Sequence, residues 1–186
     1  MNLKKIIIAL DSDNFNDTLK IVKNLKNDAF AFKIGYEFFL NFGLSGYKAI
    51  KEENANIFLD LKLHDIPNTV ANGIKAIAKL NPYFTTIHLS GGDEMQKISS
   101  NFKINTKILG VSILTSLDSK QAKKYYNNNV QEIVSNFAKN ALINKLDGIV
   151  CSPQEIAIVK KITQNKLIIV TPGIRPINYE DSKDDQ

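Results

Sequence analysis

The sequence contains few of the features that mark secreted or membrane proteins. It has one cysteine, Cys151, in 186 residues, which excludes an internal disulfide and favours a cytoplasmic location. No apolar run approaches the roughly 18 to 20 residues that a membrane helix needs, so no membrane association is expected. The N-terminal apolar stretch ends at Leu10 and is followed by Asp11 and Asp13. We therefore expect no signal peptide.

Arginine is also scarce. Of 24 lysine and arginine residues, Arg175 is the only arginine, and the net charge is +5. The lysines are spread along the chain without a dense basic run, so nucleic acid is not an expected partner. Arg175 lies in TPGIRP, and its isolation indicates a position that needs a planar, bidentate donor.

Short apolar runs alternate with helical patterns along the whole chain. Runs such as IIIAL and LIIV are continuous, as is typical of parallel strands covered on both faces. The predicted strands are 5–11, 30–35, 56–63, 84–90, 107–114, 148–152 and 167–171. The predicted helices are 14–26, 37–53, 68–80, 92–101, 130–144 and 153–163. Asp13 or Asn14 would cap the first helix, and Ser152 with Glu155 the last.

This alternation predicts a parallel α/β fold in one domain, residues 1–186. Seven strands fit either a (β/α)₈ barrel or a doubly wound sheet. The segment 116–129 is polar and includes three successive asparagines, so it predicts a long loop after the fifth strand.

One predicted strand carries charge. In FLDLKLHD, Leu59, Leu61 and Leu63 share one face, while Asp60 and Lys62 share the other. The leucines would pack against helices. The two charged groups would then point to the interior near the strand's C-terminal end, where barrel enzymes place catalytic groups.

Neighbouring strands bring more charge to the same end. Asp11 follows the first strand, Lys33 ends the second, and Asp65 follows Lys62. A structural salt bridge is the alternative interpretation. It explains the cluster poorly, because buried ion pairs rarely repay their desolvation. We interpret the cluster as a fixed electrostatic array that repels a carboxylate beside Asp60 and stabilises a carbanion beside Lys62.

The motif Asp60-x-Lys62-x-x-Asp65-Ile-Pro-Asn-Thr69 resembles the signature of the orotidine 5′-phosphate decarboxylases. Further matches occur in the family's order and cover essentially the whole chain. They are Ala9-Leu10-Asp11, Phe32-Lys33-Ile34-Gly35, Leu114-Thr115-Ser116 and Thr171-Pro172-Gly173-Ile174-Arg175-Pro176.

The resemblance implies decarboxylation of orotidine 5′-monophosphate to uridine 5′-monophosphate, the last step of de novo pyrimidine synthesis, without metal or organic cofactor. It also implies a fold, a (β/α)₈ TIM-type barrel, and a homodimer with shared active sites.

The resemblance further assigns roles to residues. Asp60 would lie against the departing carboxylate, and Lys62 would protonate the C6 carbanion. Asp11 and Lys33 would bind the ribose, and Lys33 would also belong to the catalytic network. Asp65 and Thr69 would reach the neighbouring subunit's site. Contacts to the ring and phosphate would come from Thr115, Arg175 and Gln186.

The resemblance also predicts a departure. The family's eighth strand carries part of the phosphate site, whereas this sequence reaches Gln186 in the loop after its seventh strand. We therefore expect a barrel truncated at its C-terminal end. Its first and seventh strands would keep unpaired edges, so activity is expected of a complete barrel and is not predicted for the isolated chain.

Two alternatives remain open. Related sugar-phosphate enzymes share D-x-K-x-x-D but bind magnesium through an acidic residue, and the cationic Lys33 at that position opposes a metal. A non-catalytic binding module would not need Asp60 and Lys62 together. Among the other polar residues, His64, His88 and Cys151 are predicted to be packing or structural groups.

Overall fold

A computed structural model describes residues 5–174. These residues form one parallel sheet whose strands follow the order of the sequence. The strands are β1 Ile7–Ala9, β2 Ala31–Ile34, β3 Ile57–Leu63, β4 Phe84–His88, β5 Lys107–Val111, β6 Gly148–Val150 and β7 Ile168–Val170. An order without reversal is that of a barrel and not of a doubly wound sheet.

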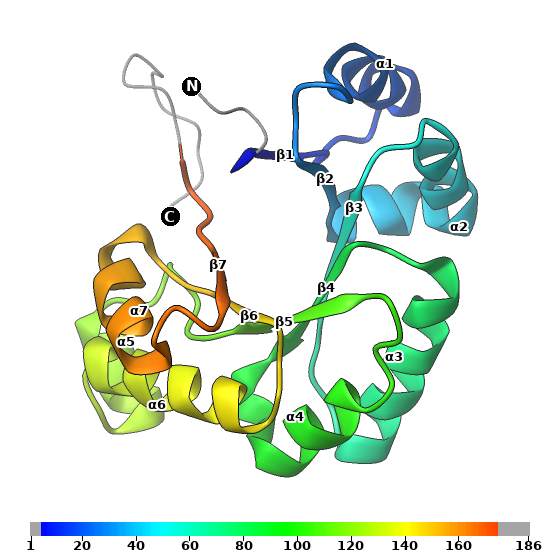
Figure 1. Cartoon of the computed structure of the whole chain (residues 1–186). Helices are drawn as coiled ribbons and strands as arrows, with labels where there is room; N and C mark the ends of the chain where they lie inside the picture. Colours follow the sequence, from blue (N-terminus) through cyan, green and yellow to red (C-terminus); the bar gives the residue numbers. More distant parts are fainter. Residues whose placement is uncertain (1–4, 175–186) are drawn as a thin grey trace.

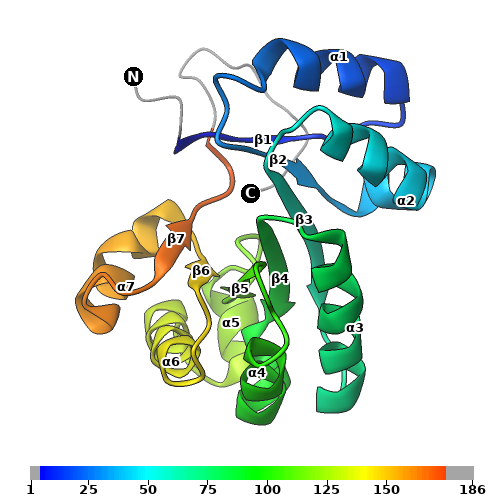
Figure 2. The same ribbon diagram turned by 45° about the vertical axis from the view of Figure 1, so that its right-hand side comes forward.

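Helices cover the outside of the curved sheet (Figures 1 and 2). They are α1 Phe15–Leu25, α2 Tyr36–Glu52, α3 Pro67–Leu80, α4 Gly92–Ser100, α5 Ser119–Tyr126, α6 Val130–Ile143 and α7 Ile156–Thr163, with short 3₁₀ turns η2 Leu89–Gly91 and η3 Pro153–Glu155. No helix within residues 5–174 is both long and apolar enough to cross a membrane.

The sheet has seven strands, one fewer than the eight of a closed (β/α) barrel. Within residues 5–174, β1 and β7 are therefore its two edges. The predicted fold class, an α/β barrel type without an eighth strand, is confirmed.

Apolar side chains fill both sides of this sheet. Phe58, Phe84 and Leu109 form the cluster inside the barrel. The outer face of β3 carries Leu59, which is fully buried among side chains of neighbouring strands and helices. Leu61 and Leu63 pack against the same cluster, as the predicted alternation requires, although the pairing of β3 with β4 is irregular between Leu59 and Leu63.

Two predicted helix caps are also confirmed. The Asn14 side chain accepts a hydrogen bond from the Asp17 amide at the start of α1. Ser152 and Glu155 form a reciprocal capping box at the start of η3, as their spacing predicted.

The prediction of a loop over 116–129 was wrong, because α5 occupies the middle of this segment. The Asp118 side chain caps the helix by accepting from the Gln121 amide at 2.8 Å. Ala122 is fully buried, and Asn127 ends the helix in a left-handed conformation. The helix sequence SKQAKKYY is mostly polar, and this composition is why the sequence predicted a loop.

Candidate active site

The charged residues of β3 form a close ion pair. Lys62 Nζ lies 2.8 Å from Asp60 Oδ2, and the Asp60 side chain is only 9% exposed. The other carboxylate oxygen, Oδ1, accepts a hydrogen bond from the Thr86 hydroxyl at 2.8 Å. Each oxygen of this buried carboxylate therefore has a partner, so its orientation is fixed from two sides.

Lys62 lies in an irregular part of β3. Its φ of 44° falls in the left-handed region, which non-glycine residues rarely adopt. Its amide donates to the Thr86 hydroxyl at 2.9 Å, and the preceding Leu61 carbonyl accepts from Tyr36 Oη at 3.0 Å. Bulges next to active sites commonly redirect a side chain, and this one brings the Lys62 amine back over Asp60.

A second ion pair joins β1 and β2. Lys33 Nζ lies 3.0 and 3.1 Å from the two oxygens of Asp11. The Asp11 side chain is 48% exposed and that of Lys33 is 23% exposed. A methyl group at Gly35 would approach Asp11 Oδ1 and Lys33 Nζ to 3.1 Å each. The glycine therefore leaves room for this pair.

The two ion pairs come from neighbouring strands. In the parallel ladder, Lys33 lies opposite Phe58, two residues before Asp60. Within residues 5–174 no ion pair connects Lys33 with Asp60 or Lys62 with Asp11. The predicted clustering of charge thus takes the form of two adjacent pairs.

Asp65 and Thr69 stand apart from these pairs. Both are exposed, in the loop after β3 and in the first turn of α3. The Asp65 carboxylate accepts from the Ile66 amide at 2.6 Å, and it forms no ion pair within the described part of the chain.

The other predicted site residues are Thr115, Arg175 and Gln186. Thr115 is exposed in the turn between β5 and α5. Arg175 and Gln186 lie outside the described residues.

Sequence reasoning did not identify a histidine pair beside the site. The rings of His64 and His88 lie 5.2 Å apart at the ends of β3 and β4. Burial lowers the pKa of His88 from its ordinary value of 6.5, and His64 and Lys62 lower it further, whereas Asp60 opposes the shift. Neither segment, KLH at His64 or TIH at His88, carries a motif that indicates that the two rings lie close together.

Cys151 is buried, and burial raises the pKa of its thiol to about 12, with a further contribution from Glu155. Such a thiol is almost entirely protonated at neutral pH and therefore unreactive. The interpretation of Cys151 as a structural residue is consistent with this environment.

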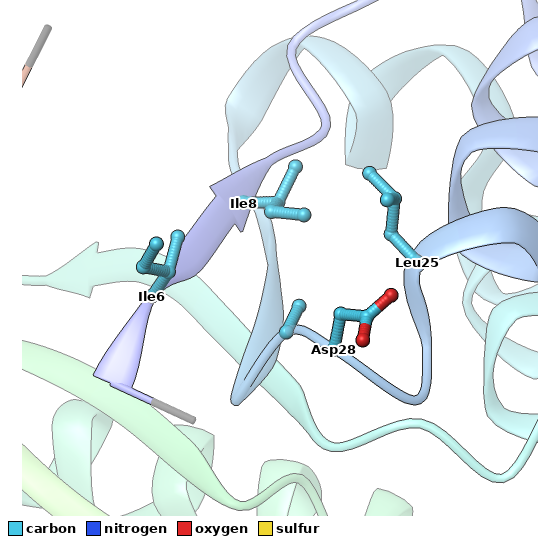
Figure 3. A pocket seen from close by; sticks show the side chains of 5 residues that line it. Ile6, Ile8, Leu25 and Asp28 are labelled. Atoms are coloured by element: carbon cyan, nitrogen blue, oxygen red, sulfur yellow. The ribbon is translucent and has the colours of Figure 1, made fainter. Parts of the chain in front are cut away.

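A separate apolar hollow lies at the outer side of β1 (Figure 3). It has a volume of about 240 Å³ and is lined by Ile6, Ile8, Leu25, Asp28 and Ala29. None of these residues belongs to either ion pair, so the hollow is distinct from the charged site.

Comparison with known proteins gives concordant matches. Residues 4–186 match the family described as "Orotidine 5'-phosphate decarboxylase / HUMPS family". The orotidine 5′-phosphate decarboxylase of Ligilactobacillus salivarius is 40% identical over 185 residues, covering 94% of this chain and 78% of that protein. The enzyme of Nitratiruptor is 39% identical, with 98% and 82% covered.

Solved structures agree. The crystal structure of orotidine 5′-phosphate decarboxylase from Lactobacillus acidophilus has a TM-score of 0.83 and 39% identity, and the match covers 92% of this chain and 81% of that one. The Methanocaldococcus jannaschii enzyme complexed with inhibitor BMP has a TM-score of 0.77 and 27% identity, with 93% and 79% covered.

Proposed function

The chain belongs to the orotidine 5′-phosphate decarboxylase family, and we propose that its buried Asp60–Lys62 pair carries the reaction. That reaction converts orotidine 5′-monophosphate to uridine 5′-monophosphate and carbon dioxide in pyrimidine biosynthesis. The protein is thus a carboxy-lyase of the decarboxylase class.

The burial of one carboxylate supports this assignment of roles, because the Asp60 side chain is 9% exposed whereas that of Asp11 is 48% exposed. Asp60 is a fixed anion whose orientation is set by Lys62 and Thr86. A substrate carboxylate placed beside it is repelled, and this repulsion disappears as carbon dioxide leaves. The Lys62 ammonium attracts the negative charge that develops on the ring. Preorganised charges of this kind act without reorganisation at the moment of reaction.

The chemical step then balances as follows. The bond between C6 and the carboxylate breaks, its electron pair stays on C6, and carbon dioxide departs. Lys62 donates a proton from Nζ to C6 and later regains one from solvent. Enzymes typically lower a reaction barrier by about 8 to 23 kcal/mol. One residue cannot supply this, so binding energy from distant parts of the substrate must contribute.

The more exposed ion pair, Asp11 with Lys33, is called the open pair below, and it fits a binding role. Asp11 is exposed and carries two acceptor oxygens, while Lys33 donates to it. Ribose hydroxyls can replace these hydrogen bonds, and we propose that Lys33 also belongs to the charged network of the site. Thr115 is proposed to contact the ring, and Arg175 and Gln186 the phosphate.

We propose that two copies of the chain form a homodimer in which Asp65 and Thr69 enter the partner's site. Their exposure beside β3 supports this arrangement. Ile66, next to Asp65 in the same loop, is 67% exposed and would be covered in such a dimer.

Subunit mixing tests the dimer. Asp65→Ala and Lys62→Ala, each inactive alone, should regain part of the activity when mixed, because a mixed dimer holds one intact site. Analytical ultracentrifugation should show a dimer. A monomer, or no recovery on mixing two dimeric variants, would remove the shared-site arrangement.

Lys33 supports a reaction without a metal ion. Its ammonium forms an ion pair with the Asp11 carboxylate. A positive charge at this position opposes the binding of a divalent cation. We expect EDTA to leave turnover unchanged. Loss of activity in EDTA and recovery with magnesium would favour the sugar-phosphate alternative.

The single buried thiol also fits our proposed cytoplasmic location.

Turnover of orotidine 5′-monophosphate, followed by ultraviolet absorbance, tests the function. The assay should compare the 186-residue chain with a version extended by an eighth strand and helix. Turnover in either form supports the assignment. Absence of turnover in both would contradict it.

A further inference from the structure

Thr86 contacts both members of the buried pair with a single hydroxyl. Its side chain is fully buried on β4. Oγ1 donates to Asp60 Oδ1 at 2.8 Å and accepts from the Lys62 amide at 2.9 Å. A hydroxyl has only one proton to donate. The Thr86 hydroxyl donates it to the carboxylate, and a lone pair of its oxygen accepts the hydrogen bond from the amide.

The strand register gives this position its importance. Leu59 lies opposite Thr85 and Leu63 lies opposite Ile87. Between these partners, β3 contains Asp60, Leu61 and Lys62, whereas β4 contains only Thr86. The backbone of β3 must bulge here. In a regular ladder the Lys62 amide would donate to a carbonyl of β4, whereas here it donates to the Thr86 hydroxyl.

We propose that Thr86 is a positioning residue that couples the orientation of the Asp60 carboxylate to the left-handed backbone of Lys62. This inference rests on the proposed roles of Asp60 and Lys62. The hydroxyl holds Oδ1, which leaves Oδ2 facing the Lys62 amine. It also holds the amide of the residue whose φ is 44°. One side chain thus sets the separation of the anion and the cation.

Thr85 provides a matched control. It is also fully buried, and its hydroxyl donates to the Leu59 carbonyl at 2.9 Å. Alternation places it on the opposite face of β4, away from Asp60. Thr85→Val and Thr86→Val each remove one buried, bonded hydroxyl with little change in shape. A purely structural hydroxyl predicts equal consequences for the two variants.

Steady-state kinetics with orotidine 5′-monophosphate separate these outcomes, in whichever chain form turns over. We expect Thr86→Val to lower kcat by about 100-fold, the usual effect of misplacing a reacting group by about 1 Å. KM should change little, because Thr86 contacts neither Asp11 nor Lys33. Thr86→Ser, which keeps the hydroxyl, should restore most of kcat. Thr85→Val should retain near wild-type kcat.

A second readout does not depend on activity. Amide hydrogen exchange at Lys62, measured by NMR, should accelerate in Thr86→Val and remain slow in Thr85→Val and Thr86→Ser. If Thr86→Val does not fold, the comparison of Thr86→Ala with Thr85→Ala replaces it.

Equal kcat and equal Lys62 exchange in the Thr85 and Thr86 variants would overturn the inference. The function itself is judged separately by Lys62→Ala. If that variant is inactive while Thr86→Val is normal, only the role of Thr86 fails. If Lys62→Ala stays active, the proposed mechanism fails.

Discussion

The two ion pairs at the strand ends are chemically alike but differ in how firmly they are held. The Asp11–Lys33 pair joins two strands, and nearly half of the Asp11 side chain is exposed. The Asp60–Lys62 pair lies within one strand, has an almost completely buried carboxylate and shares the Thr86 hydroxyl. The same residue types therefore form one adaptable pair and one fixed pair.

We propose that this difference reflects separate roles in substrate binding and in the chemical step. An exposed pair exchanges partners at low cost, because water and ligand hydroxyls can replace either ion. A buried pair is expensive to assemble, and its retention indicates a use other than stability. A fixed array is useful where charge must be stabilised without rearrangement. We therefore propose that the first pair binds the ribose and that the second carries the decarboxylation.

Removing the cation of the fixed pair should have the largest effect. We expect Lys62→Ala to lower kcat by about 10⁴-fold or more, because the proton donor and a stabilising charge are lost together. Lys23→Ala is a control, because Lys23 is an exposed surface lysine. A folded Lys62→Ala protein, verified by its melting temperature, with substantial turnover would remove Lys62 from its role.

Neutralising the anion of the open pair should have a smaller and different effect. A charge-assisted hydrogen bond is worth about 1.5–3 kcal/mol, so Asp11→Asn should reduce kcat/KM by about 10- to 100-fold. Most of this change should appear in KM. A loss confined to kcat would mean that the two pairs do not divide the work as proposed.

Crowding the open pair should cost less still. In Gly35→Ala the added methyl would lie 3.1 Å from Asp11 Oδ1 and Lys33 Nζ. Both side chains can shift by a few tenths of an ångström, so we expect a change of roughly 0.5 kcal/mol, or about two- to threefold in KM. Measured kinetics that match those of Lys62→Ala would indicate that this pair is as rigid as the buried one.

The smallest effect concerns pH. Because the folded-state pKa of His88 is lowered by burial, then by His64 and Lys62, protonation favours the unfolded chain. The stability contributed by neutral His88 is complete above its unfolded value of about 6.5 and is lost as pH falls toward the lower folded value. The free energy of unfolding, measured with denaturant, should fall less steeply between pH 7.5 and 5.5 in His88→Gln than in the wild type. An identical pH dependence would show that His88 does not contribute to it.

Much of the fold was predictable because buried parallel strands leave continuous apolar runs. The period of two along β3 also predicted that Asp60 and Lys62 share a face. The bulge was not predictable, since nothing about a lysine indicates a positive φ. Thr86 was missed for a related reason. A β-branched residue in a strand indicates packing, and only the register with β3 gives its hydroxyl two partners.

The helix α5 illustrates the opposite failure. Its polar sequence suggested a loop, whereas a capping aspartate, the buried Ala122 and the contact of Tyr126 with Phe137 place it against α6. Local polarity is therefore a poor guide where a short helix buries only a narrow face.

A crystal structure with uridine 5′-monophosphate bound tests the division of labour most directly. We expect the pyrimidine ring to lie against Lys62 Nζ, with C6 the nearest ring carbon, and the ribose hydroxyls to contact Asp11 and Lys33. A nucleotide with its ring at the open pair, or bound in the apolar hollow beside β1, would contradict it.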